Sequence, residues 1–153
     1  MSKNLNTLKG SIQGHNFLSS ASGVMAKLVK EITGDDYTIV CEFWDRSTAG
    51  VRFRGKKAWG NFPSLDETKV IPLSKFRELI AYALHELCHV LYTSNHPWDD
   101  AVKQHGHFVG SLINGLEDPR IEIAGVNNVT NVRFFSFFEL IINSVLAENG
   151  MPK

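Results

Sequence analysis

The chain has 153 residues, of which 43% are hydrophobic and 21% are charged. These values are typical of one folded domain with its own hydrophobic core, here residues 1–153, and they exclude a largely disordered chain. Sixteen basic residues balance sixteen acidic ones, so no general charge attracts nucleic acid or an anionic membrane.

The N-terminal third predicts a polar start followed by a helix. Residues 1–20 are rich in Ser, Asn and Gly, and we expect them to form a flexible arm or a short leading helix. Apolar residues at helical spacing then predict a helix over residues 20–33. Gly34 follows as its C-terminal stop.

Strand signals occupy the next part of the chain. Residues 37–44 are rich in β-branched and aromatic side chains and predict a strand. Residues 51–54 and 58–62 predict a hairpin around the turn Gly55-Lys56-Lys57. A further short extended piece is predicted at Val70-Ile71.

A long buried helix is predicted after Pro72. Ser74 is the expected N-cap, and an apolar face runs from Phe76 to Leu91 at helical spacing. The helix is expected to end at Asn95–Pro97, because the residue before a proline resists helical geometry.

Further helices are predicted in the C-terminal third. One covers residues 99–116, and Pro119 interrupts or restarts it, with Asp118 as the cap of the new helix. Residues 127–131 predict a turn, and residues 134–148 predict a last helix with an aromatic start that packs in the core or forms an interface. Helix, strands and then helices indicate an α+β fold.

Two features bear on the location of the protein. The N-terminus lacks the apolar stretch of a signal peptide, and no run reaches the roughly 20 apolar residues of a membrane span. The two cysteines, Cys41 and Cys88, are too few for a disulfide framework. We therefore expect reduced thiols, a cytoplasmic protein and no membrane partner.

The strongest chemical signal is the sequence His85-Glu86-Leu87-Cys88-His89 in the long predicted helix. Residues four apart lie on one helix face, so His85 and His89 could bind one Zn²⁺. Glu86 could then reach a zinc-bound water, and this pattern is a known metalloprotease signature. Burying these polar side chains in an apolar helix would be costly without such a purpose.

A catalytic zinc ion usually has three protein ligands, and the third must come from elsewhere. Residues 114–122 hold three carboxylates and an arginine. Glu117 is the first choice and Asp118 the alternative, while Glu122 stands four residues after Asp118 and could support a histidine, as Arg120 could orient a ligand. Less favoured sources of a third ligand are the histidines His96, His105 and His107.

The two motifs together resemble the metallopeptidase-like region of cobaltochelatase-subunit-like proteins of bacteria and phages, which often precedes a von Willebrand factor A domain. In that family a helical zinc motif ending in His-Val-x-Tyr-Thr, here reaching Thr93, pairs with a downstream Leu-Glu-Asp-x-Arg-Ile-Glu. The likeness covers residues 45–125, including Thr48-Ala49 near the family's edge strand. It implies a zincin-like fold with a small β-sheet packed on the central helix, and one zinc ion per chain. It further implies His85 and His89 as ligands, a downstream acidic ligand, and the host cytoplasm for a phage-encoded chain.

Two functions follow as expectations. The first is a zinc metallopeptidase, in which Glu86 takes a proton from the zinc-bound water and an edge strand within residues 51–62 holds a peptide or protein substrate. Arg52 and Arg54 would favour acidic substrates if they are not simply solvated. The second is a zinc-stabilised binding module that docks to an AAA+ ATPase or a von Willebrand factor A-type partner. Nucleic acid is the least favoured partner and rests on a few basic residues near Trp59.

Overall fold

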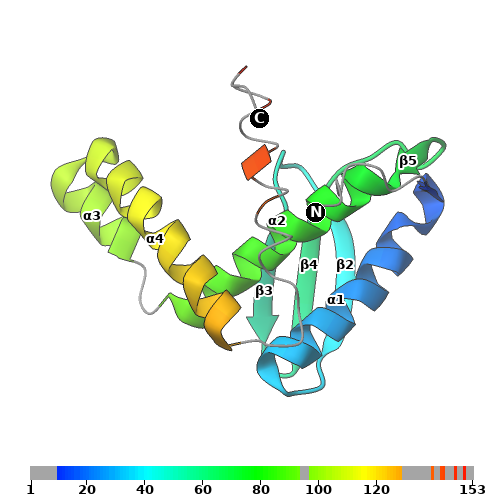
Figure 1. Cartoon of the computed structure of the whole chain (residues 1–153), viewed down its shortest axis with the longest axis horizontal. Coiled ribbons are helices and arrows are strands. Elements are labelled where there is room, and N and C mark those ends of the chain that lie inside the picture. The colour runs from blue at the N-terminus through cyan, green and yellow to red at the C-terminus, as the bar shows by residue number, and fades with distance from the viewer. Residues whose placement is uncertain are drawn as a thin grey trace, which may run out of the picture.

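The computed structural model describes residues 10–93 and 97–128, together with the single positions 139, 142, 143, 147 and 150. Over these residues the fold is α+β, as the sequence predicts (Figure 1). The elements in chain order are β1 (Ser11–Gln13), the 3-10 helix η2 (Gly14–Asn16), α1 (Phe17–Thr33), β2 (Thr38–Trp44), β3 (Gly50–Arg54), β4 (Lys57–Pro63), β5 (Val70–Pro72), α2 (Leu73–Tyr92), α3 (Pro97–His105) and α4 (His107–Asn128). Within these ranges no helix combines the length and the apolar character needed to cross a membrane.

The main sheet has the strand order β2-β4-β3, which leaves β3 at an edge. The predicted hairpin is confirmed, because β3 and β4 pair antiparallel, whereas β2 pairs parallel to β4. Trp44 is level with Pro63, and Gly50 is level with Asn61. The connection 45–49 must therefore cross the end of β4 to bring the chain from one edge of the sheet to the other.

Of the two alternatives expected for residues 1–20, a flexible arm or a short leading helix, the described part shows an ordered segment that includes the short helix η2. Strand β1 pairs antiparallel with β5, and α1 begins at Phe17 rather than near Ser20. Phe17 is completely buried and packs edge-on against Phe62 and Phe76. The β1–β5 pairing and the buried Phe17 ring together anchor this otherwise polar segment.

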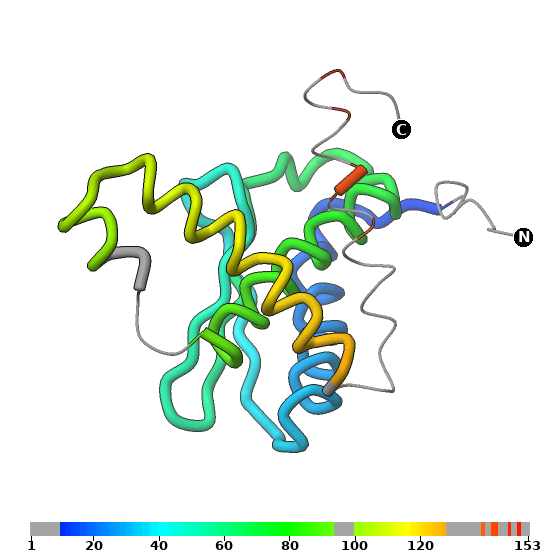
Figure 2. The backbone as a smooth tube through the Cα atoms, turned by 60° about the vertical axis from the view of Figure 1, so that its left-hand side comes forward, coloured from blue at the N-terminus to red at the C-terminus, as the bar shows by residue number. Residues whose placement is uncertain are grey.

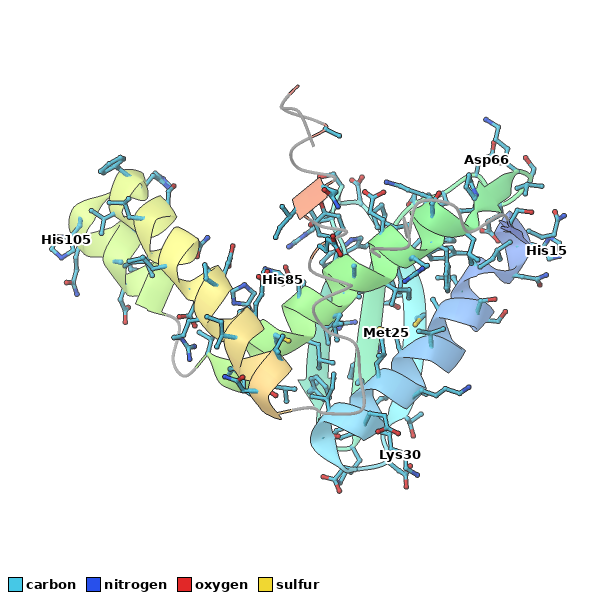
Figure 3. All side chains as sticks on the ribbon, in the orientation of Figure 1. His15, Met25, Lys30, Asp66, His85 and His105 are labelled. Atoms are coloured by element: carbon cyan, nitrogen blue, oxygen red, sulfur yellow. The ribbon has the colours of Figure 1, made fainter. Side chains whose placement is uncertain are left out.

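Helices α1 and α2 lie on one face of the main sheet and enclose the core with it (Figure 1). Met25, labelled in Figure 3, contributes to this core from α1. Helix α1 ends as predicted, because Gly34 adopts a left-handed conformation with φ of 73° and donates its N–H to the Lys30 carbonyl at 2.8 Å.

Helix α2 confirms the predicted long buried helix, but its ends differ from the prediction. The chain passes directly from β5 into α2, so Pro72 occupies the N-cap position and Ser74 lies inside the helix. At the other end the helix stops at Tyr92, before the predicted end, and Thr93 is extended. Leu84 and Leu87, on the predicted apolar face, are completely buried.

Helices α3 and α4 correct the prediction for the next segment. The single helix expected over residues 99–116 is divided at Gly106, which has φ of 83°. The expected restart at Pro119 does not occur, because α4 continues through this proline. Pro119 has no N–H to donate, and the complete burial of Ile121 against α2 compensates for that lost hydrogen bond.

The α3 end of the α3–α4 pair projects away from the sheet (Figure 1), while α4 runs across α2 (Figure 2). The tip of the pair carries His105, far from the middle of α2 (Figure 3). The turn predicted at residues 127–131 overlaps the end of α4 at its first two residues. The rest of that turn and the predicted helix 134–148, with its aromatic start, lie outside the continuously described ranges.

Candidate metal centre

Two histidines of α2 and one aspartate of α4 point their ligating atoms at a common position. The Nε2 atoms of His85 and His89 are 3.2 Å apart. Asp118 Oδ1 lies 3.1 Å from His89 Nε2 and 3.7 Å from His85 Nε2. Ligands of a tetrahedral metal ion with bonds near 2.1 Å are about 3.4 Å apart, so the three atoms are spaced as ligands of one metal ion would be. Figure 3 shows His85 in the angle between α2 and α4.

The packing of α4 on α2 positions Asp118. Ile121 is fully buried in a cluster with Leu84, Leu87 and Cys88 of α2. Because α4 is continuous, Asp118 lies one turn before Ile121 on the same helix face and is directed at the histidine pair.

A second carboxylate of α4, that of Glu122, lies beside the other ring nitrogen of His85. Glu122 Oε1 lies 3.3 Å from His85 Nδ1, while His85 Nε2 faces Asp118. In metal sites, a carboxylate beside the second ring nitrogen of a ligating imidazole can orient the ring. Burial raises the pKa of Glu122 above its ordinary value. Asp118 and Glu122, four residues apart, thus lie at opposite ring nitrogens of His85.

Glu117 forms hydrogen bonds with Thr93 and Arg120 rather than facing the histidine pair. Its carboxylate accepts hydrogen bonds from the Thr93 hydroxyl at 2.6 Å and from both Nε and Nη2 of Arg120. Arg120 Nη2 also donates to the Tyr92 carbonyl at 2.6 Å, which ties α4 to the end of α2. The Arg120 guanidinium and the Thr93 hydroxyl lower the pKa of Glu117 to about 2. Thr93 Oγ1 in turn lies 3.4 Å from His89 Nδ1, so Thr93 lies between Glu117 and His89.

Glu86, the residue after His85 in α2, borders a cavity whose lining does not include the two histidines. This cavity of about 310 Å³ lies between α2, the edge strand β3 and the connection 45–49. Burial raises the pKa of Glu86, and the neighbouring His89 opposes that rise. A carboxylate with a raised pKa, beside an open cavity, is suited to accepting and returning a proton near neutral pH.

The two histidines differ in their electrostatics. Burial lowers the pKa of His85, which favours the neutral imidazole that binds metals. The Asp118 carboxylate raises the pKa of His89, because it stabilises the protonated ring. Protons therefore compete with a cation mainly at His89.

The structure brings the two predicted histidines together, and it changes the preferred acidic ligand from Glu117 to Asp118. His85 and His89 lie together as the sequence predicts, and Glu122 lies beside His85, but Asp118 rather than Glu117 stands beside the histidine pair. Glu117 was preferred because a restarted helix would have used Asp118 as its cap, and α4 does not restart.

The less favoured histidines and the two cysteines are not among the residues whose atoms converge within the described part of the chain. Both His105 and His107 are exposed on the α3–α4 pair, and His96 falls outside the described residues. Both cysteines are free thiols, and burial raises the pKa of Cys41 to about 11 and that of Cys88 to about 12. Sequence reasoning missed the role of Thr93, although its spacing of four residues from His89 was a readable signal.

A comparison of the chain with protein-family models, curated proteins and solved structures found no match.

Proposed function

We propose that this protein is a zinc-dependent metallopeptidase-like domain of zincin type that hydrolyses peptide bonds. The observation that carries the proposal is the convergence of His85 Nε2, His89 Nε2 and Asp118 Oδ1 within 3.1–3.7 Å, with Glu86 beside them at an open cavity. Zinc held by these three atoms would lower the pKa of a water molecule and polarise a carbonyl group.

In this proposal, side chains around the metal position transfer the proton, orient the histidines and bind the substrate. Glu86 accepts a proton from the attacking water and returns it to the leaving nitrogen. Glu122 orients His85, and Thr93 orients His89 with the support of Glu117. The edge strand β3 borders the same cavity and offers backbone groups on which an extended peptide could add as a further strand.

Glu86→Gln tests the assignment of the base. The amide is nearly isosteric but cannot take a proton at neutral pH, so we expect hydrolysis of a peptide library to fall by at least about 100-fold. Zinc content, measured by elemental analysis, should stay near one ion per chain. Glu67→Gln, a change at an exposed acidic residue between β4 and β5, is the matched control. Cleavage by the Glu86 variant at the parent rate would remove Glu86 from the mechanism, and a protein that takes up no zinc would refute the proposal.

An exposed apolar face on α4 favours a second candidate function, a zinc-stabilised module that binds another protein. Phe108 and Leu116 are 76% and 77% exposed, and Leu112 lies between them at helical spacing. Such a face suits a partner with an apolar groove, and an AAA+ ATPase or a von Willebrand factor A-type domain is the kind of partner that the motif resemblance implies. Full zinc occupancy without cleavage of any library peptide would favour this function over hydrolysis.

A further inference from the structure

The cavity beside Glu86 has walls that are fixed by the fold. Gly50 has no side chain, and a Cβ atom there would collide with the ring of Trp44, which lies across β3 at this point. Trp44 Nε1 donates a hydrogen bond to the Thr48 carbonyl at 2.7 Å, which holds the ring against the connection 45–49. With about 310 Å³, the cavity is at the lower end of the range for small-ligand sites. It therefore suits a single side chain of a larger ligand.

Two arginines line this cavity, and they differ in their partners. Arg52 Nη2 lies 3.0 Å from Glu42 Oε1, and the same oxygen accepts a hydrogen bond from Asn61 Nδ2 at 2.8 Å. Arg46 lies with its guanidinium 4.8 Å from the centroid of the Trp44 ring and has no ion pair with any described residue. Arg46 is therefore the cation of the cavity that a ligand could neutralise.

We infer that the cavity is a subsite for an acidic side chain of a peptide, whose carboxylate binds Arg46 while its backbone lies toward Glu86 and β3. The inference deepens the proposed hydrolysis and rests on it for the identity of the ligand as a peptide. Stacking on Trp44 restricts the guanidinium before the ligand arrives, so less side-chain entropy is lost on binding. A basic side chain at the same position would be repelled by Arg46.

Peptide binding to the full-length protein in the presence of a chelator tests this subsite without hydrolysis. The probes are fluorescein-labelled pentapeptides that are identical except for a central Glu, Gln, Lys or Leu, and the readout is fluorescence anisotropy. We expect the Glu peptide to bind roughly 3–10-fold more tightly than the Gln peptide, as for one partly exposed charge-assisted hydrogen bond. Equal affinities for the Glu and Gln peptides would overturn the inference.

Three variants separate the cavity from general charge. Arg46→Gln should abolish the preference for Glu over Gln, and Arg46→Glu should reverse it in favour of the Lys peptide. Lys57→Gln is the matched control, because Lys57 also lies over a tryptophan ring, at 4.9 Å from the centroid of Trp59, but does not line the cavity. If Lys57→Gln reduced the preference as much as Arg46→Gln, the effect would be one of net charge and the subsite would be refuted.

The outcomes distinguish failure of the subsite from failure of the proposed function. A preference for the Glu peptide that depends on Arg46, in a protein that neither takes up zinc nor cleaves peptides, would leave the subsite standing and refute the hydrolysis. Zinc uptake and peptide cleavage without any preference for the Glu peptide would refute the subsite and leave the proposed hydrolysis standing.

Discussion

Glu117 and Asp118 are neighbours in the sequence, yet their carboxylates have different partners. Asp118 lies on the face of α4 that packs on α2, and its carboxylate approaches both histidines. Glu117 is one position earlier on the helix, so its side chain points in another direction and contacts Thr93 and Arg120. The choice between them depends on whether α4 is continuous at Pro119. Local sequence preference favours a helix start there, and the burial of Ile121 overrides that preference.

Three alanine variants check the ligand assignment through zinc affinity. We expect Asp118→Ala to weaken zinc binding by more than about 100-fold, because it removes a direct ligand, and Glu122→Ala by roughly 10–100-fold, because it only supports His85. Glu117→Ala should have the smallest effect, since it acts on His89 through Thr93. Affinity is measured by competition with a chromogenic chelator. If Glu117→Ala were the most damaging variant, the assignment would return to Glu117.

At the scale of elements, α2 brings the motif to the core and α4 completes the site. The contact between them depends on Ile121, which is fully buried, while Ile123 on the same helix is 60% exposed. We expect Ile121→Ala to lower the free energy of unfolding by about 2–4 kcal/mol through the cavity it leaves. Zinc affinity should fall as well, because Asp118 loses its position. Ile123→Ala is the control and should change both quantities little. The pair is compared by urea denaturation and chelator competition, and unchanged zinc affinity in Ile121→Ala would contradict this role of the contact.

In the sheet, the close contact between Gly50 and the Trp44 ring leaves no room for a side chain at position 50. A methyl group there would collide with the Trp44 ring, so Gly50→Ala should destabilise the fold by roughly 1–3 kcal/mol and deform the cavity beside Glu86. Gly23→Ala is a suitable contrast, because a Cβ at Gly23 meets nothing within 4 Å and the residue lies inside α1. That variant should gain about 0.5–1 kcal/mol of helix stability. Thermal unfolding of both variants decides the matter, and a Gly50→Ala protein as stable as the parent would show that Trp44 moves freely.

The sequence predicted those features that depend on local chemistry. Periodicity and turn residues located α1, the β3–β4 hairpin and α2, and the four-residue spacing placed His85 and His89 together. Features that depend on contacts between residues far apart in the sequence could not be predicted from local patterns. The parallel pairing of β2 with β4 brings Trp44 and Arg46 to Glu86, and no local pattern in these segments encodes that meeting.

At the scale of the whole molecule, the candidate metal centre joins two parts of the fold. Helix α2 belongs to the core with the sheet and α1, while α4 belongs to the pair whose α3 end projects away from the sheet (Figure 1). Described contacts between the two include the Ile121 cluster and the Arg120–Glu117–Thr93 hydrogen bonds. A cation bound by His85, His89 and Asp118 would add a further link between these helices and should stabilise the folded state.

Thermal unfolding with and without zinc measures that link. A ligand that binds only the folded state stabilises it by about 2.7 kcal/mol at 100 times its Kd, and each kcal/mol raises Tm by about 2–4 °C for a protein of this size. We therefore expect zinc to raise Tm by roughly 5–10 °C at such a concentration. Asp118→Ala should abolish most of this rise, because the cation then has ligands on α2 alone, whereas Glu86→Gln should retain it, because Glu86 is not a ligand. An equal rise in the parent and in Asp118→Ala would mean that zinc binds without joining α4 to α2, and the three-residue centre would be refuted even if the protein contained zinc.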